Sequence, residues 1–196
     1  MKTLIKPLAV ILFLVMSASS HAQDFVKRGT TEMGGSALFA YQNATREGNH
    51  SQSGHAMTLL LDLYAGFMIT DGFELGFMPA FIFQDVENIS GTIFNLFLAP
   101  SFNMNPKGTV HPFVEILLGF NAASSGNGLG YGLDVGTKAV IGTRSLFVFQ
   151  VQFLRQFYNS GGISGNSQYS NNIDLITVSA GLGFRIFTPR EVTKKK

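Results

Sequence analysis

The sequence contains no cysteine, so disulfides and thiolate chemistry have no part in this protein. Charge is also scarce: 13% of the 196 residues are charged, which is about half the usual share of a soluble domain. Beyond the N-terminal segment, no stretch approaches the ~18 consecutive apolar residues that a membrane helix requires. Such a chain is either unusually buried or folded as a closed barrel in lipid, because only helices and closed barrels satisfy every backbone polar group there.

The first 22 residues have the order of a secretory signal peptide. Lys2 and Lys6 give a positive start, residues 8–16 form an apolar run, and Ser20-His21-Ala22 resembles a small-residue cleavage site. The run is too short to cross a bilayer as a helix, which disfavours the alternative of a membrane-anchored N-terminus. The expected organisation is a signal peptide over residues 1–22, one outer-membrane β-barrel domain over residues 23–187 and a basic periplasmic tail over residues 188–196.

Removal of the leader also removes the excess of positive charge. Two of the 14 Lys and Arg residues lie in the leader, and the remaining 12 equal the number of Asp and Glu residues. A formally neutral chain has no basic field that would attract nucleic acid. We therefore expect no nucleic-acid partner, and no motif in the sequence points to a cofactor.

Alternation of apolar and polar residues with a period of two occurs eight times, with turn residues between the runs. Pro79, Pro100 and Pro112 fall inside these runs and predict local bulges, because proline cannot donate a ladder hydrogen bond. The eight expected strands cover about residues 31–41, 55–69, 73–84, 92–103, 110–121, 130–141, 146–157 and 173–187.

The connections alternate in length, with longer loops expected at residues 42–54, 85–91, 122–129 and 158–172. In outer-membrane barrels the short turns face the periplasm and the long loops face outward. The pattern predicts an all-β fold: an eight-stranded antiparallel up-and-down transmembrane β-barrel with both termini periplasmic.

A soluble eight-stranded barrel such as a lipocalin would show the same alternation, with the apolar face turned inward. Its polar face should then be rich in Lys and Glu. Here that face is mostly Gly, Ser, Thr, Asn and Gln, which favours lipid on the apolar side. Aromatic girdles are expected at both membrane interfaces, with Tyr41, Tyr131, Tyr158 and Tyr169 at the outer ends and Phe73, Phe102, Phe147 and Phe184 at the periplasmic ends.

Seven ionisable residues fall on the face that should line the lumen. An interior of limited water requires such charges to be paired or partly neutralised. The set permits two interpretations: a charged network that plugs the barrel, or a narrow path with an acidic lining that favours cations. The seven residues are Glu32, Asp62, Glu74, Glu115, Asp134, Lys138 and Arg185.

Enzymatic signals are weak. His50 shares the first expected loop with Ser51 and Glu47, a combination that polar loops produce easily. His50 and His55 lack further ligands for a metal site, and His111 is isolated in the sequence. Arg155 and Asp174 are expected near the outer rim of neighbouring strands, where they could pair or contact lipid headgroups.

The last strand, Ser179-Ala180-Gly181-Leu182-Gly183-Phe184-Arg185-Ile186-Phe187, resembles the terminal strand of outer-membrane barrels, and Glu32-Met33-Gly34-Gly35-Ser36 is similar to their first strands. The whole expected mature chain resembles the small barrels of the OmpA-transmembrane-domain and OmpX kind. This resemblance implies contact with outer-membrane lipid and recognition by the barrel-assembly machinery through Gly181, Gly183, Phe184, Ile186 and Phe187.

The leading functional hypothesis is a non-enzymatic protein with an envelope-structural or surface-interaction role, in which loops 42–54 and 158–172 meet an extracellular partner. The alternatives are a narrow pore or lateral-diffusion channel for small or apolar solutes and, with less support, a lipid-modifying enzyme.

Overall fold

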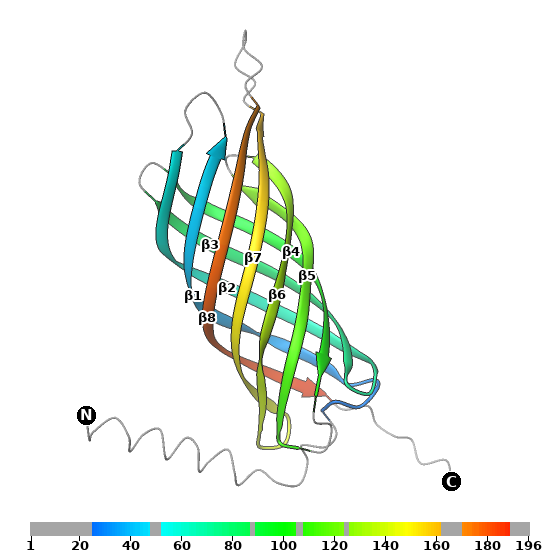
Figure 1. Cartoon of the computed structure of the whole chain (residues 1–196). Helices are drawn as coiled ribbons and strands as arrows, with labels where there is room; N and C mark the ends of the chain where they lie inside the picture. The colour runs from blue at the N-terminus through cyan, green and yellow to red at the C-terminus, as the bar shows by residue number, and fades with distance from the viewer. Residues whose placement is uncertain are drawn as a thin grey trace, which may run out of the picture.

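The computed structural model describes residues 25–47, 52–86, 89–104, 108–123, 126–161 and 170–188. The expected signal peptide, residues 189–196, His50 and Tyr169 lie outside these ranges. Eight antiparallel strands form a closed barrel in which each strand pairs with its sequence neighbours and β8 pairs with β1 (Figure 1). The predicted all-β up-and-down barrel is therefore confirmed. The strands are β1 (Thr31–Glu47), β2 (Gln52–Thr70), β3 (Phe73–Val86), β4 (Ile89–Asn103), β5 (Val110–Ala123), β6 (Gly126–Ile141), β7 (Ser145–Gly161) and β8 (Ser170–Thr188).

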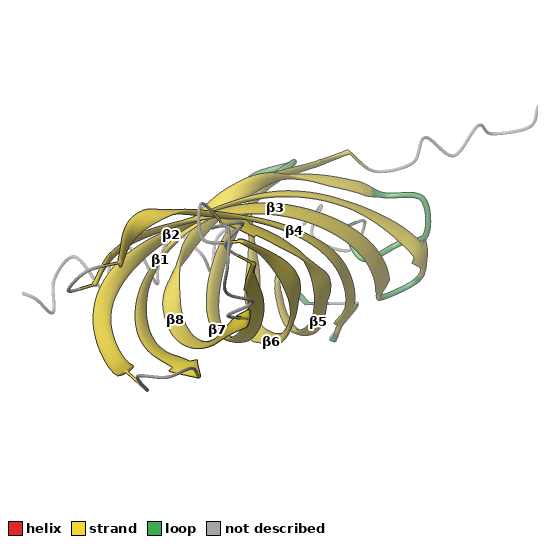
Figure 2. Ribbon diagram, turned by 90° about the horizontal axis from the view of Figure 1, so that it is seen from above, coloured by secondary structure: helices red, strands yellow, loops and turns green. Residues whose placement is uncertain are grey.

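The first and last described residues lie at the same end of the barrel, which we call the terminal end; the opposite end is the distal end. Phe25 packs against Phe187 there, with ring centroids 5.4 Å apart. Viewed along the molecule, β2, β3 and β4 form one wall and β5 to β8 the facing wall (Figure 2). Among the described residues no helix has the length and hydropathy needed to cross a membrane.

The strands are longer than alternation alone predicted, and most of the added length is at the distal end. Residues 42–47 belong to β1 and residues 158–161 to β7, although both segments were expected in loops. The backbone ladder continues there, from Gln42 paired with Ala56 to Arg46 paired with Gln52. Alternating hydropathy reveals only the part of a strand that has one apolar face. Backbone pairing continues beyond that part, because it needs no apolar side chain.

The predicted bulges at the prolines are wrong. The β2–β3 register is the same on both sides of Pro79, and the β4–β5 register is the same on both sides of Pro100. Pro112 pairs with Thr137 within an unbroken ladder. The missing N–H of each proline is therefore accommodated without an inserted residue. The register shift that does occur lies between Met68 and Thr70, at the terminal end of β2.

The outer face of the barrel is an apolar band. Exposed aromatic and aliphatic side chains alternate with buried ones along the strands, as predicted, and the band has the character of a lipid-facing surface. Tyr41 and Tyr131 are exposed toward the distal end, but Tyr158 is only 4% exposed and points into the lumen, contrary to prediction. The band includes Met33, Phe39, Leu63, Phe77, Phe102, Leu118, Leu133, Phe153, Leu182 and Phe184.

The lumen is more apolar than its predicted lining of small and polar residues. One buried cluster closes the terminal end, and its members are Phe25, Val26, Met68, Val140, Leu146 and Phe187. A second fills the middle of the barrel and includes Leu38, Leu60, Met78, Ile82, Phe97, Leu117 and Leu154. The apolar inward positions on the strands were overlooked because a strand that is apolar on both faces loses its alternation.

Candidate functional site

Of the seven predicted lumen residues, the four nearest the terminal end form a neutral group of two acids and two bases. Lys138 Nζ lies 2.9 Å from Glu32 Oε2 and 2.8 Å from Glu74 Oε2. Arg185 Nη1 donates to Glu32 Oε1 at 2.7 Å. All four side chains are fully buried, and they come from β1, β3, β6 and β8. We call this group the lumen tetrad; it ties four strands together across the interior.

Tyr64 on β2 stands between the two cations. The Arg185 guanidinium carbon lies 3.8 Å from the Tyr64 ring centroid, and Lys138 Nζ lies 5.4 Å from it. Glycines make room for the ring: a Cβ on Gly76 would lie 2.4 Å from the Tyr64 hydroxyl, and one on Gly66 1.9 Å from Glu74 Oε1. The ring faces thus stabilise both cations in a site where water is excluded.

A second group extends from the tetrad toward the distal end. Arg185 Nη2 donates to Gln150 Oε1 at 3.4 Å, and Gln150 Nε2 donates to Asp62 Oδ2 at 3.2 Å. Ser36 Oγ also donates to Gln150 Oε1, at 3.5 Å. Asp62 is thereby linked to the tetrad through a neutral amide.

The remaining two acids are buried without such links. Glu115 on β5 and Asp134 on β6 are directly opposed in register, and both are 0% exposed. No described protein group hydrogen-bonds to any of their four carboxylate oxygens. The structure therefore places all seven predicted lumen residues inside the barrel, with five of them linked and two apart.

The residues before β1 close the terminal end of this site. Phe25 is fully buried, and Lys138 Nζ lies 5.3 Å from its ring centroid. Backbone hydrogen bonds hold the segment in place, from Gly72 N to the Val26 carbonyl and from Gly29 N to the Met68 carbonyl, each 2.8 Å.

Two further residues contact the tetrad: Asn103 Nδ2 donates to Glu74 Oε2 at 3.2 Å, and the Phe113 ring centroid lies 5.3 Å from Lys138 Nζ. Neither these two nor Phe25, Tyr64 and Gln150 were among the predicted site residues. Asn103, Gln150 and Tyr64 occupy inward-facing positions of alternating strands, so the sequence contained a signal for them. Phe25 had no such signal, because it precedes the first strand.

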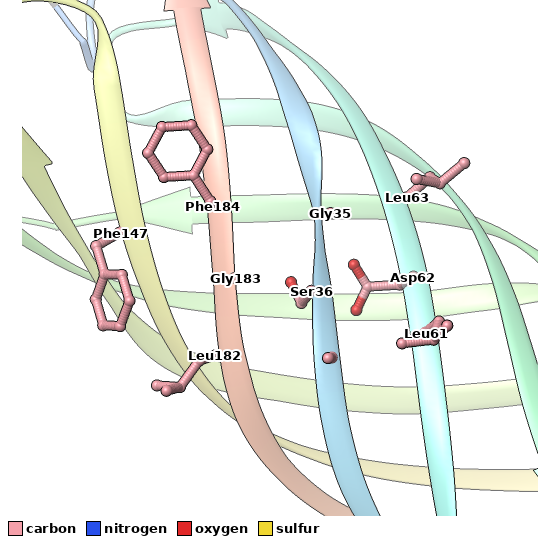
Figure 3. A pocket seen from close by; sticks show the side chains of 10 residues that line it. Gly35, Ser36, Leu61, Asp62, Leu63, Phe147, Leu182, Gly183 and Phe184 are labelled. Atoms are coloured by element: carbon pink, nitrogen blue, oxygen red, sulfur yellow. The ribbon is translucent and has the colours of Figure 1, made fainter.

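An apolar groove of about 550 Å³ lies on the outer face, over β1 and its neighbours (Figure 3). Leu61 and Leu63 flank it on one side, and Leu182 and Phe184 on the other. Gly35 and Ser36 form part of its floor, where Ser36 pairs in register with Asp62. The ladders on both sides of β1 are continuous at this level, so the groove is a surface depression and not an opening between strands.

Arg155 and Asp174 form an ion pair on the outer face toward the distal end. Arg155 Nε and Nη2 donate to the Asp174 carboxylate, with Nη2 2.6 Å from Oδ2. The guanidinium also lies 4.9 Å from the Phe157 ring centroid. The two side chains are 38% and 30% exposed, which suits the polar edge of the apolar band.

The residues of the expected assembly signal do not share one face. Phe184 and Ile186 are exposed in the apolar band, whereas Gly183 and Phe187 point inward. Phe187 packs in the apolar cluster at the terminal end. An assembly factor that read the outer face of the completed strand would therefore meet Phe184 and Ile186, and not the terminal aromatic ring.

No protein-family model matches the chain, and a search of curated proteins gave no match. Solved structures do resemble it. The outer membrane protein OprG from Pseudomonas aeruginosa has a TM-score of 0.56 at 13% identity, over 84% of this chain and 98% of that one. The outer membrane protein AlkL in lipid bilayers has a TM-score of 0.59 at 10% identity, over 86% and 94%. Neisserial surface protein A has a TM-score of 0.52 at 13% identity, over 79% and 97%.

The chain has the fold of the small outer-membrane β-barrels. Because the matches span nearly the whole of each solved chain, the likeness concerns the complete barrel rather than a shared hairpin. At identities of 10–13% it concerns the fold alone.

Proposed function

We propose that the protein is a non-enzymatic barrel of the bacterial outer membrane with an envelope-structural or surface-interaction role. This role is exercised through extracellular segments 42–54, between β1 and β2, and 158–172, between β7 and β8, which we call the distal hairpins. Two observations support an embedded but closed barrel: the outer face is apolar, and packed side chains and ion pairs fill the lumen. Partners at this membrane are lipid, the barrel-assembly machinery during biogenesis and an extracellular molecule at the hairpins.

The filled lumen carries this proposal because it disfavours a pore. An ion crossing the interior would have to pass the apolar cluster in the middle and the Phe25 cluster at the terminal end. Apolar constrictions of this kind exclude water and ions. The lumen tetrad would also have to separate, which leaves buried charges without partners.

Planar-bilayer recordings test the closed barrel. Purified folded protein, identified by its faster gel migration before boiling, should insert without giving discrete conductance steps. Steps whose size changed in a Leu117→Gly variant would show that ions pass the middle cluster and would overturn the proposal. A porin reconstituted in parallel establishes that insertion events are detected.

The second candidate function is the lateral passage of apolar solutes, which the outer groove favours. The apolar walls of the groove would suit an apolar solute, since the Ser36 and Asp62 side chains point into the lumen. Passage would require the continuous β1–β2 or β1–β8 ladder to open. Vesicles containing the protein should therefore take up an apolar dye no faster than protein-free vesicles; faster uptake that Gly35→Leu abolished would favour this candidate.

The positions of His55 and His111, the two histidines within the described ranges, do not support lipid-modifying chemistry. His55 is near the start of β2 at the distal end and stacks on Tyr41, with ring centroids 6.1 Å apart. His111 is buried at the opposite end beside Phe25. Incubation with lipid A or phospholipid should leave the lipid mass spectrum unchanged. A new product that His55→Ala removed would contradict the non-enzymatic proposal.

A further inference from the structure

The two acids that remain outside the linked groups belong to a longer polar row on the inner wall. Ser101 on β4 opposes Glu115 on β5, which opposes Asp134 on β6, which in turn opposes Gln152 on β7. Directly opposed residues on one face of an antiparallel pair have Cβ atoms about 4.5–5.5 Å apart. The four side chains therefore form a contiguous row across four strands.

Within the part of the chain that the structure describes, no side-chain polar atom of this row has a hydrogen-bond partner. This holds for the Ser101 hydroxyl, both oxygens of Glu115, both oxygens of Asp134 and both amide atoms of Gln152. All four residues are at most 1% exposed. Buried polar atoms are nearly always paired, so an unbroken run of unpaired ones indicates a ligand of complementary chemistry.

The nearby cations already have carboxylate or amide partners, and of their nitrogen atoms only Arg185 Nε lacks a hydrogen-bond partner among the described residues. Lys138 contacts Glu32 and Glu74, and Arg185 contacts Glu32 and Gln150. The inner positions of β6 on either side of Asp134 are Gly132 and Gly136, which bring no donor. Two adjacent buried carboxylates without a directly bonded cation would be costly, because Lys138 and Arg185 act on them only from a distance, so a cation is the complementary species.

The donor set indicates which cation. Carboxylate, hydroxyl and amide oxygens are hard ligands of the kind that Ca²⁺ takes, roughly six to eight at a time, in flexible geometry. The row can offer about six: two carboxylates, one hydroxyl and one amide oxygen. No cluster of three or more His, Asp or Glu placed for metal binding occurs in the described residues, so neutral donors must complete the set.

We propose that Glu115 and Asp134, completed by Ser101 and Gln152, bind one divalent hard cation of the Ca²⁺ type inside the barrel. The ion neutralises the acids that the lumen tetrad leaves uncompensated. Because apolar clusters lie beyond the row toward both ends, exchange with the solvent is slow and the ion enters before the barrel has closed.

The experiment uses the full protein expressed to membranes with Ca²⁺ present, extracted in mild detergent and gel-filtered in Ca²⁺-free buffer. Atomic emission should find about one Ca²⁺ per chain. When the same protein is unfolded and refolded with a chelator, it should lose the ion and unfold at lower temperature. Ca²⁺ added during refolding, but not after it, should restore both properties.

Variants separate this site from other effects. E115Q and D134N each remove one negative ligand and should lower Ca²⁺ retention about tenfold or more. D174N is the matched control and should leave Ca²⁺ retention unchanged, because Asp174 lies on the outer face beside Arg155. Replacing buried carboxylates by amides of the same shape should not prevent folding, which heat-modifiable gel migration verifies.

Three results would overturn the proposal: no Ca²⁺ retained by the folded protein, retention unchanged in the E115Q/D134N double variant, or equal loss in D174N. The first would mean that water or shared protons satisfy the row, and the other two that Ca²⁺ binds elsewhere. The surface role proposed above concerns the distal hairpins and is unaffected by any of these results.

Discussion

The side chains of the lumen illustrate how environment decides the value of an ion pair. Lys138 is fully buried with Glu32 and Glu74, whereas Arg155 and Asp174 are 38% and 30% exposed. Removing one partner of a buried pair leaves an uncompensated charge and costs about 3–5 kcal/mol. An exposed pair contributes about 0–1 kcal/mol, because water screens both charges.

We therefore predict that Lys138→Met lowers the free energy of unfolding by about 3–5 kcal/mol, since Glu74 keeps only its hydrogen bond from Asn103. Arg155→Met is the matched control and should cost far less, because water screens the exposed pair. Urea unfolding of both variants in lipid vesicles, followed by gel migration, gives the comparison. Equal losses would show that the lumen tetrad does not stabilise the barrel.

Individual lumen residues could be predicted only where the alternation of apolar and polar residues shows which side chains point inward. Glu32, Lys138 and Arg185 fall on polar faces of regular runs, so their inward position followed from the sequence. Which acid would meet which base did not, because pairing across the lumen depends on strand tilt and register over the whole ring. The role of Phe25 was also hidden, since a residue outside a strand has no phase.

At the scale of the element, the seam between β8 and β1 depends on close backbone approach. A Cβ on Gly181 would lie 2.1 Å from the Ala37 carbonyl oxygen and 2.6 Å from the Leu38 Cα. Both are backbone atoms, so β1 itself would have to move. At Gly130 on β6 the nearest atoms, 2.9 and 3.0 Å away, belong to the side-chain amide of Asn121 and can rotate.

Gly181→Ala should therefore destabilise the barrel by about 1–3 kcal/mol, the usual cost of overpacking. Gly130→Ala should cost less than about 1 kcal/mol, because only a side chain has to adjust. The temperature at which the fast-migrating folded band disappears on gels measures both. A larger loss of stability for Gly130→Ala than for Gly181→Ala would show that the backbones at the β8–β1 seam are not more tightly packed than the surroundings of Gly130.

The strands show where sequence patterns stop being informative. Their number, order and terminal-end boundaries were predicted well; β3, for example, begins at Phe73 as expected. Their distal ends were placed too early, because Asn43, Thr45 and their neighbours pair through the backbone without an apolar face. The prolines were misjudged for a related reason: a missing N–H interrupts a ladder without changing its register.

For the molecule as a whole, orientation is the property that the proposed surface role needs most. The distal hairpins can meet a partner only if they face outward and the terminal end faces the periplasm. Asn43 is exposed at the distal end of β1, and Thr143 is exposed in the turn between β6 and β7 at the terminal end. Because the chain has no cysteine, a single introduced thiol reports one position without background.

We predict that a membrane-impermeant maleimide labels N43C on intact cells but leaves T143C unlabelled. Permeabilising the outer membrane should make T143C reactive while N43C stays unchanged, because only the barrier at the terminal end has been removed. Labelling of T143C alone on intact cells would mean the reverse orientation, which would place the hairpins in the periplasm and refute a surface role. Labelling of both positions would contradict a membrane-spanning barrel, since the apolar band between them would then separate no compartments.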